Sequence, residues 1–253
     1  MTGRMAIVLA AGKGTRMKSD LPKVLHPVCS RPMIHFVLDS IAQCGVDHTV
    51  VVVGHRADDV RSELANRPQV DYAVQDEQLG TGHAVKICKP FLESHEGAVL
   101  VVAGDSPLIQ VDSIAALMKT YDEAHPACIL GTTQKPDPSG LGRIVRDGEG
   151  RFAKIVEEKE ATEAEKQITE VNMSTYLFDC QRLLFSLERL TNDNSKGEYY
   201  ITDCPGILKQ NGEDVRAMNV LQPCESLSIN TLEELAIVDA EMRKMGYQDA
   251  SDA

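Results

Sequence analysis

MAIVLAAGKGTRM, residues 5–17, joins an apolar run to a loop that contains two glycines. The first seven residues are apolar, which predicts a strand buried on both faces of a sheet. Lys13 and Arg16 follow in the loop, and Lys23 stands a little beyond it. Small residues and glycines let backbone N–H groups approach a phosphate closely, so the loop predicts a phosphate site. The alternative is a glycine-rich turn with solvated basic residues.

Short runs rich in β-branched residues, most of them nearly continuous and apolar, recur along the first half of the chain and alternate with helical patterns. Further strands are predicted at residues 49–53, 70–74 and 98–103. Helices are predicted at residues 33–44, 56–65, 82–92 and 111–124. This alternation predicts a doubly wound α/β fold, with a mainly parallel, Rossmann-like mixed sheet flanked by helices. Ligands of such folds bind at the carboxyl ends of the strands, so residues that directly follow a strand are candidates for a site.

The second half of the chain has a less regular pattern. A β-hairpin is predicted at residues 143–156, around a glycine-containing turn at 147–150. After a charged segment, a strand is predicted at 170–178, a helix interrupted near Pro205 at 199–210, and an amphipathic helix at 231–244. Residues 246–253 are expected to form a frayed tail.

Composition excludes several classes of function. The formal net charge is −12, and phosphate-backbone binding to DNA or RNA needs a basic surface, so no nucleic-acid partner is expected. An anionic substrate must instead be met by a local cluster of cations, backbone N–H groups or metal. No membrane span or signal peptide is predicted, because the early apolar run is too short. Seven scattered cysteines without a CxxC pattern indicate free thiols, no zinc site and a cytoplasmic protein.

Two common nucleotide-binding motifs are missing from the glycine loop. The sequence lacks GxxxxGK[ST], and the loop lacks the third glycine of GxGxxG. These absences disfavour a small-molecule kinase and a dinucleotide-dependent dehydrogenase.

Polar residues follow two of the other predicted strands. Asp105 comes after the strand at 98–103, where a carboxylate suits Mg²⁺; the alternative is an Asx turn before Pro107. Gln75 follows the strand at 70–74, and Gly80 and Thr81 precede a helix, where a side-chain amide and a backbone N–H can read the edge of a pyrimidine. The alternative there is a tight turn with Thr81 as the helix N-cap, and an N-cap turn also leaves N–H groups for a ligand.

Together, LAAGKGTRM and the following LPKVL resemble the signature loop of the sugar-phosphate nucleotidyltransferases. The resemblance is greatest to the uridyltransferase domain of the bacterial N-acetylglucosamine-1-phosphate uridyltransferases. It extends over nearly the whole chain through further motifs in the same order: Gln75-x₃-Leu-Gly-Thr-Gly, Gly104-Asp105, Gly140-Leu-Gly-Arg-Ile, Ile155-Val-Glu, Gly197-Glu-Tyr-Tyr and Asn230. It implies that the chain forms UDP-N-acetylglucosamine and pyrophosphate from UTP and N-acetylglucosamine 1-phosphate, with Mg²⁺ as cofactor.

The resemblance also implies a role for each matching residue. Arg16 and Lys23 would be catalytic, stabilising charge on the phosphates. Asp105 and Asn230 would bind the metal, although the sequence around Asn230 also fits a helix cap, with Thr231 and Glu234 spaced as a capping box. Nucleotide-binding positions would be Leu9, Ala10, Ala11, Gly12, Gln75, Gly80 and Thr81. Sugar-binding positions would be Gly142, Glu157 and Asn172, with Tyr200 and Thr202 as weaker candidates.

Three positions depart from the family pattern. Ala103 stands where the family usually has Tyr, Ser174 replaces the Gly of an Asn-x-Gly motif, and Ser228 replaces a Gly before the metal-site Asn. The first two lie beside the expected sugar pocket, so the alternative function is nucleotidyl transfer to a different sugar 1-phosphate. A non-catalytic nucleotide-sugar-binding regulatory protein is the alternative from another class. Such a protein should lose Arg16, Lys23, Asp105 or Asn230, and all four are present.

On this resemblance we assign residues 1–230 to a nucleotidyltransferase domain and 231–253 to a C-terminal helix and tail. The six-residue repeat of a left-handed β-helix is missing from the sequence, so acetyl transfer, the second activity of two-domain relatives, is not expected. In those relatives the β-helix drives trimer assembly, which leaves the oligomeric state open here.

Overall fold

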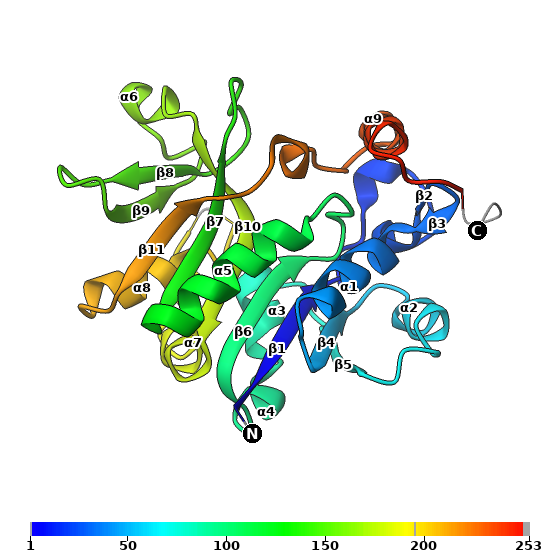
Figure 1. The fold of residues 1–253 in the computed structure, drawn as a ribbon, viewed down its shortest axis with the longest axis horizontal. Coiled ribbons are helices and arrows are strands. Elements are labelled where there is room, and N and C mark those ends of the chain that lie inside the picture. The colour runs from blue at the N-terminus through cyan, green and yellow to red at the C-terminus, as the bar shows by residue number, and fades with distance from the viewer. Residues whose placement is uncertain (1, 195, 250–253) are drawn as a thin grey trace.

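The computed structural model describes residues 2–194 and 196–249, and its centre is one large twisted sheet (Figure 1). In this described part, seven strands lie in the order β11-β7-β10-β6-β1-β4-β5, and β8 and β9 extend the sheet from β10. The strands are β1 (Thr2–Leu9), β4 (His48–Val53), β5 (Val70–Val74), β6 (Glu96–Ala103), β7 (Cys128–Gln134), β8 (Arg143–Arg146), β9 (Phe152–Val156), β10 (Glu170–Asp179) and β11 (Val215–Asn219).

Strand direction confirms the mixed, mainly parallel sheet that the sequence predicts. Strand β1 is parallel to both β4 and β6, whereas β10 runs antiparallel to β6 and β7. From β1 the chain proceeds outward to β4 and β5, then returns to the other side of β1 to form β6. The β1–β6 boundary is therefore the switch point of the topology, where ligands of open α/β sheets bind.

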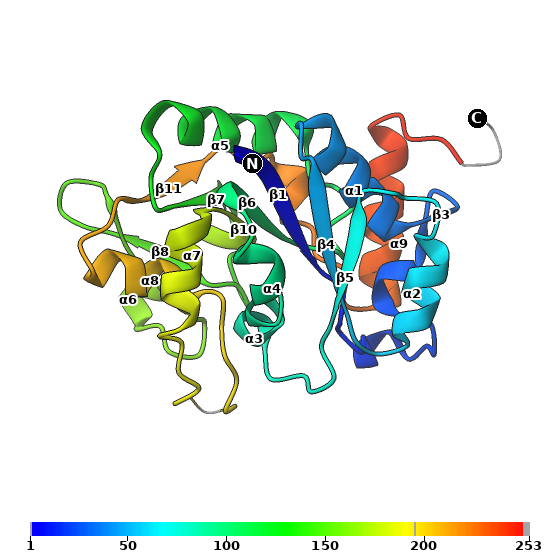
Figure 2. The same ribbon diagram turned by 90° about the horizontal axis from the view of Figure 1, so that it is seen from below.

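Helices cover both faces of the sheet (Figure 2). One face is covered by α1 (Met33–Gln43), α2 (Ala57–Glu63) and α5 (Val111–Ala124). The other is covered by α3 (Thr81–Lys86), α4 (Lys89–Leu92), α7 (Cys180–Leu187) and α8 (Asp203–Gln210), and the short α6 (Glu163–Lys166) lies against the β8–β9 hairpin. The central strands are nearly continuous apolar runs because they are buried between these two layers.

A third, smaller core attaches α9 (Leu232–Lys244) to the first part of the chain. It contains the buried side chains of Met17, Val238 and Met242. Helix α9 packs on β2 (Pro27–Val28), which pairs with β3 (Arg31–Pro32), and Asp239 accepts a hydrogen bond from the Cys29 N–H at 2.7 Å. The glycine loop and the C-terminal helix are thus held together by one apolar cluster.

Several predicted boundaries are wrong for local reasons. The helix predicted at 82–92 is two helices, α3 and α4, and Pro90 lies in the first turn of the second, where its missing N–H costs nothing. For the same reason Pro205 does not interrupt α8. Residues 246–249 are not frayed, since Asp249 accepts hydrogen bonds from Arg243 and Ser30; residues 250–253 lie outside the described residues.

Some elements of the fold were not predicted, and the cysteines and helices of the described residues bear on disulfides and membrane spans. Strands β7 and β11 and helix α7 were not predicted from the sequence. All seven cysteines are free thiols, and six of them are buried. Among the described residues, none of the helices combines the length and apolarity that a membrane crossing requires.

A buried carboxylate in β10 provides a test of the packing. Glu170 is buried, accepts a hydrogen bond from Thr132 at 2.6 Å, and pairs with two guanidinium nitrogens of Arg146 at 2.7 Å. Arg146→Ala leaves this carboxylate without its cation and should lower the free energy of unfolding by about 3 kcal/mol. Arg216→Ala breaks an exposed pair with Asp214 and should cost less than about 1 kcal/mol in urea denaturation. Equal losses would contradict this account of Glu170.

Candidate active site

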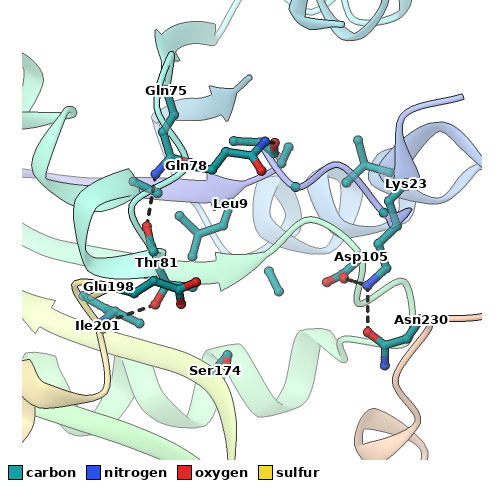
Figure 3. Close-up of a pocket in the computed structure, with 18 of the residues that line it drawn as sticks. Leu9, Lys23, Gln75, Gln78, Thr81, Asp105, Ser174, Glu198, Ile201 and Asn230 are labelled. Carbon is teal, nitrogen blue, oxygen red and sulfur yellow. Dashed lines mark hydrogen bonds and ion pairs between the residues drawn. The ribbon is translucent and has the colours of Figure 1, made fainter. Parts of the chain in front are cut away.

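A cavity of about 460 Å³ opens at the carboxyl ends of β1 and β6 (Figure 3). Eleven of its lining residues were predicted from the sequence to be catalytic, nucleotide-binding or metal-binding: Leu9, Ala10, Ala11, Gly12, Arg16, Lys23, Gln75, Gly80, Thr81, Asp105 and Asn230. The cavity therefore gathers all the predicted catalytic, nucleotide-binding and metal-binding positions. Of the predicted sugar-binding positions, Gly142, Glu157 and Asn172 are not among its lining, whereas the weaker candidate Tyr200 is.

The loop after β1 forms one wall of the cavity. Gly14 has φ 59°, in the left-handed region, and a Cβ there would lie 2.9 Å from Cβ of Lys23. Only glycine fits both demands, and it lets the chain fold back so that Lys23 faces the cavity. Met17, at the end of the short helix η1 (Thr15–Met17), is 1% exposed and anchors the loop in the third core. Lys13, by contrast, is exposed and is not a lining residue.

Positive charge gathers at the end of the cavity beside Asp105. The Lys23 ammonium, on η2 (Lys23–Leu25), forms an ion pair with Asp105 and lies 3.2 Å from Oδ1 of Asn230. Arg16 donates to the same Asn230 oxygen at 2.7 Å. Figure 3 shows Lys23, Asp105 and Asn230 pointing toward one another from three separate segments. Among the residues that line this end of the cavity, the two cations Arg16 and Lys23 outnumber the one carboxylate, Asp105, as an anionic ligand needs on this acidic chain.

Asn230 is held in place by the cap of α9 but is not itself the cap. Thr231 is the N-cap: its hydroxyl accepts from the Glu234 N–H at 3.2 Å, and the Glu234 carboxylate accepts from the Thr231 N–H at 3.1 Å. Glu234 also accepts from the backbone N–H of Asn230. The capping box thus fixes the Asn230 backbone while its side-chain oxygen faces Arg16 and Lys23.

The residues present fit a bound Mg²⁺. An Asp105 oxygen and the Asn230 amide oxygen converge on one cation, the Lys23 ammonium, so the ammonium marks a place that suits positive charge. Hard oxygen donors are the ligands that Mg²⁺ prefers, and it usually takes few protein ligands and completes its shell with water and substrate phosphates. Across residues 2–194 and 196–249 there is no cluster of three or more His, Cys, Asp or Glu that could hold a metal.

At the opposite end of the cavity, a buried amide has a fixed orientation. Gln75 is 5% exposed, and its Nε2 donates to the Gly80 carbonyl at 3.0 Å. A carbonyl can only accept, so the amide nitrogen must face Gly80, and His83 Nδ1 at 3.1 Å then also accepts. The remaining polar atom of Gln75, the oxygen Oε1, is an acceptor.

Thr81 is not the N-cap of α3, contrary to the alternative considered from sequence. Gly80 is the N-cap, and the Thr81 hydroxyl accepts a hydrogen bond from the Ile201 N–H at 3.1 Å. Gly80 has φ 101°, and a Cβ there would collide with the Tyr199 carbonyl. Glycine is therefore required where the segment after α7 closes over this end of the cavity.

Some of the predicted sugar-binding residues line a second cavity of about 200 Å³. Glu157 and Thr202 line it, and Tyr200 lines both cavities. Gly142 lies next to Glu157, because a Cβ on this glycine would be 3.5 Å from the carboxylate. Burial raises the pKa of Glu157, and the nearby carboxylates of Glu160 and Asp203 raise it further.

Asn172 lines neither of these two cavities. It is buried, its N–H donates to the Gly142 carbonyl at 2.9 Å, and its Nδ2 donates to the Tyr176 hydroxyl at 2.7 Å. Its Oδ1 is buried and has no hydrogen-bond partner within the described chain. An acceptor in this state can bind a donor group of a ligand that reaches it.

Three polar residues that line the main cavity, Thr15, Gln78 and Glu198, were given no role from the sequence, and Ser174 was noted only as a departure from the family pattern. Gln78 donates to the Ala11 carbonyl at 2.7 Å and so braces the glycine loop. Gln78 lies inside the motif that begins at Gln75, and Glu198 lies inside the motif that begins at Gly197. Their place in these family motifs could have indicated that they belong to the site. Nothing local in the sequence marks Ser174 except the departure from the Asn-x-Gly pattern.

Comparisons with known proteins place this geometry in a family. The model of the MobA-like NTP transferase domain family matches residues 6–202. Three similar relatives are bifunctional GlmU proteins. They come from Brevibacillus brevis (46% identity, 94% of this chain, 51% of the relative), Shouchella clausii (43%, 96% and 53%) and Listeria monocytogenes (47%, 95% and 52%). The chain spans about half the length of the curated relatives it matches.

A solved structure supports the fold alone. The crystal structure of a Bacillus anthracis protein assigned as a glucose-1-phosphate thymidylyltransferase, in complex with a sucrose, superposes with a TM-score of 0.79. The two sequences are 21% identical, and the match covers 96% of this chain and 97% of the other.

Placement of the basic residues predicts their effect on phosphate binding. Lys23→Ala and Arg16→Ala each remove a charge-assisted contact and should weaken pyrophosphate binding by about tenfold or more. Lys13→Ala is the matched control, because Lys13 lies in the same loop but outside the cavity, and it should change affinity by less than about threefold. Isothermal titration calorimetry measures all three. An effect of Lys13→Ala as large as that of Lys23→Ala would show that binding depends only on total charge.

Proposed function

The chain belongs to the family of MobA-like NTP transferase domains, and on that premise we propose that it forms UDP-N-acetylglucosamine and pyrophosphate from UTP and N-acetylglucosamine 1-phosphate. The observation that supports this most is the convergence of Arg16, Lys23, Asp105 and Asn230 at the β1–β6 switch point. The sugar is proposed from the resemblance to bifunctional GlmU proteins. The product is a precursor of the cell wall, and a cytoplasmic location goes with this proposal.

The reaction is a direct in-line displacement. An oxygen of the sugar 1-phosphate attacks the α-phosphorus of UTP, the bond from that phosphorus to the bridging oxygen breaks, and pyrophosphate leaves with the electron pair. Arg16 and Lys23 stabilise the negative charge on the phosphates, and backbone N–H groups of residues 11–14 hold them in position. Mg²⁺, held by Asp105 and Asn230, would supply further charge neutralisation. No side-chain nucleophile is required.

The orientation of Gln75 favours uracil over cytosine. Its nitrogen is committed to the Gly80 carbonyl, so Oε1 is the atom available to a base. Uracil carries an N–H at position 3 and can donate to Oε1, whereas cytosine has an unprotonated acceptor nitrogen there. Two facing acceptors repel, and a site built for one hydrogen-bond pattern rejects the other strongly.

Ala103 and Ser174 support one alternative, a different hexose 1-phosphate as acceptor. Both line the main cavity, where the family pattern has other residues. The non-catalytic alternative has less support, because the four polar residues that it should lose are present and contact one another.

Pyrophosphate release tests the proposed function directly. The enzyme is incubated with Mg²⁺, UTP or CTP, and the 1-phosphates of N-acetylglucosamine, glucose and N-acetylgalactosamine in turn. We expect turnover with UTP and N-acetylglucosamine 1-phosphate, at least about a hundredfold less with CTP, and loss in Asp105→Ala. Turnover with another sugar alone would transfer the assignment to that sugar. Nucleotide-sugar binding without any turnover would move the protein to the regulatory class.

A further inference from the structure

Ser174 has a backbone conformation that serine rarely adopts. Its φ is 54°, in the left-handed region, where the side chain crowds the backbone. It lies where the register between β10 and β7 shifts, between Asn172 and Thr175. Of the six non-glycine residues with positive φ in residues 2–194 and 196–249, Ser174 alone lines the main cavity. An unfavourable conformation kept at a cavity wall points to a function for the side chain.

Ser174 places a hydroxyl at the wall of the main cavity. A serine hydroxyl has one hydrogen to donate, so it can bond an acceptor oxygen of a ligand in the cavity. Asn172, two residues earlier in β10, donates its Nδ2 to the hydroxyl of the buried Tyr176 at 2.7 Å, and its own buried Oδ1 has no partner within the described chain. Two nearby residues of β10 thus carry polar atoms with hydrogen-bonding capacity left for a ligand.

The position of Ser174 matches the side from which the sugar must enter. The glycine loop, with Arg16 and Lys23, holds the leaving pyrophosphate, and in-line attack requires the sugar 1-phosphate to approach from the opposite side. Figure 3 shows Ser174 across the cavity from Gln78, between the end with Thr81 and Glu198 and the end with Lys23 and Asp105. Ala103 lines the same cavity, and its methyl group offers no hydrogen bond.

We propose that Ser174 is a specificity-determining residue whose hydroxyl donates a hydrogen bond to an acceptor oxygen on the hexose of the sugar phosphate. The inference rests on the proposed function, because it assigns Ser174 to the sugar side of that site. It adds a side-chain donor at a position where the family pattern has a glycine.

Binding of UDP-N-acetylglucosamine and of UDP, measured by calorimetry on the same variants, tests this contact. Ser174→Ala removes the hydroxyl and keeps Cβ, whereas Ser174→Gly removes both and suits the left-handed backbone. Both variants should bind UDP-N-acetylglucosamine about three- to tenfold more weakly and UDP with unchanged affinity. Ser30→Gly is the matched control, since Ser30 is an exposed serine with φ 60° on the β2–β3 turn, away from the cavity, and should change neither affinity.

Thermal unfolding separates loss of the contact from loss of the fold. Ser174→Gly should not lower Tm, because glycine adopts this backbone readily. Unchanged UDP-N-acetylglucosamine affinity in both variants, or an equal loss of UDP affinity, would overturn the proposal. So would a wild type that binds UDP-N-acetylglucosamine no better than UDP. If the expected binding pattern is found but no sugar supports pyrophosphate release, the proposed reaction fails while the Ser174 contact stands.

Discussion

The hydrogen bond from the Gly104 N–H to the Leu9 carbonyl, at 2.9 Å, joins the carboxyl ends of β1 and β6. It continues the parallel pairing that runs along both strands from Thr2 opposite Glu96 to Leu9 opposite Ala103. A side chain at Gly104 would press on this carbonyl, since its Cβ would lie 3.1 Å from the Leu9 oxygen. Because the two strand ends meet here, the glycine loop and Asp105 face one cavity, and the cation cluster depends on that meeting.

Charge explains why this cluster must be local. A chain with a formal net charge of −12 repels nucleotides and sugar phosphates at long range. Arg16 and Lys23 face the cavity with Asp105 and the neutral Asn230, so the cavity lining is positively charged at the β1–β6 switch point. Farther along, Glu157, Glu160 and Asp203 make the second cavity acidic, which suits neutral sugar hydroxyls better than phosphate. The two cavities thus differ in the charge of the chemical groups that each suits.

The sequence predicts best what depends on local pattern. Apolar runs predicted β1, β4 and β6, because strands buried on both faces need a continuous apolar sequence. Asp105 could be placed at the ligand edge for the same reason. Strand β5 is an edge strand, and its β-branched residues predicted it. The contact of Asn230 with Lys23 depends on how α9 packs on Met17 and β2, across more than 200 residues of chain, and only the family resemblance indicated it. The left-handed backbone conformation of Ser174 lies at a register shift in β10, and no pattern in the sequence indicates that shift.

The central claim is that Asp105 and Asn230 bind a metal ion beside the nucleotide phosphates, in the place where Lys23 now contacts both. A crystal grown with UDP-N-acetylglucosamine and Mn²⁺, which replaces Mg²⁺ and scatters anomalously, tests it most directly. We predict an anomalous peak coordinated by the Asp105 carboxylate and Asn230 Oδ1, with the Lys23 ammonium moved to a phosphate oxygen. A bound nucleotide sugar with Lys23 still paired to Asp105, and no peak at these oxygens, would contradict the account.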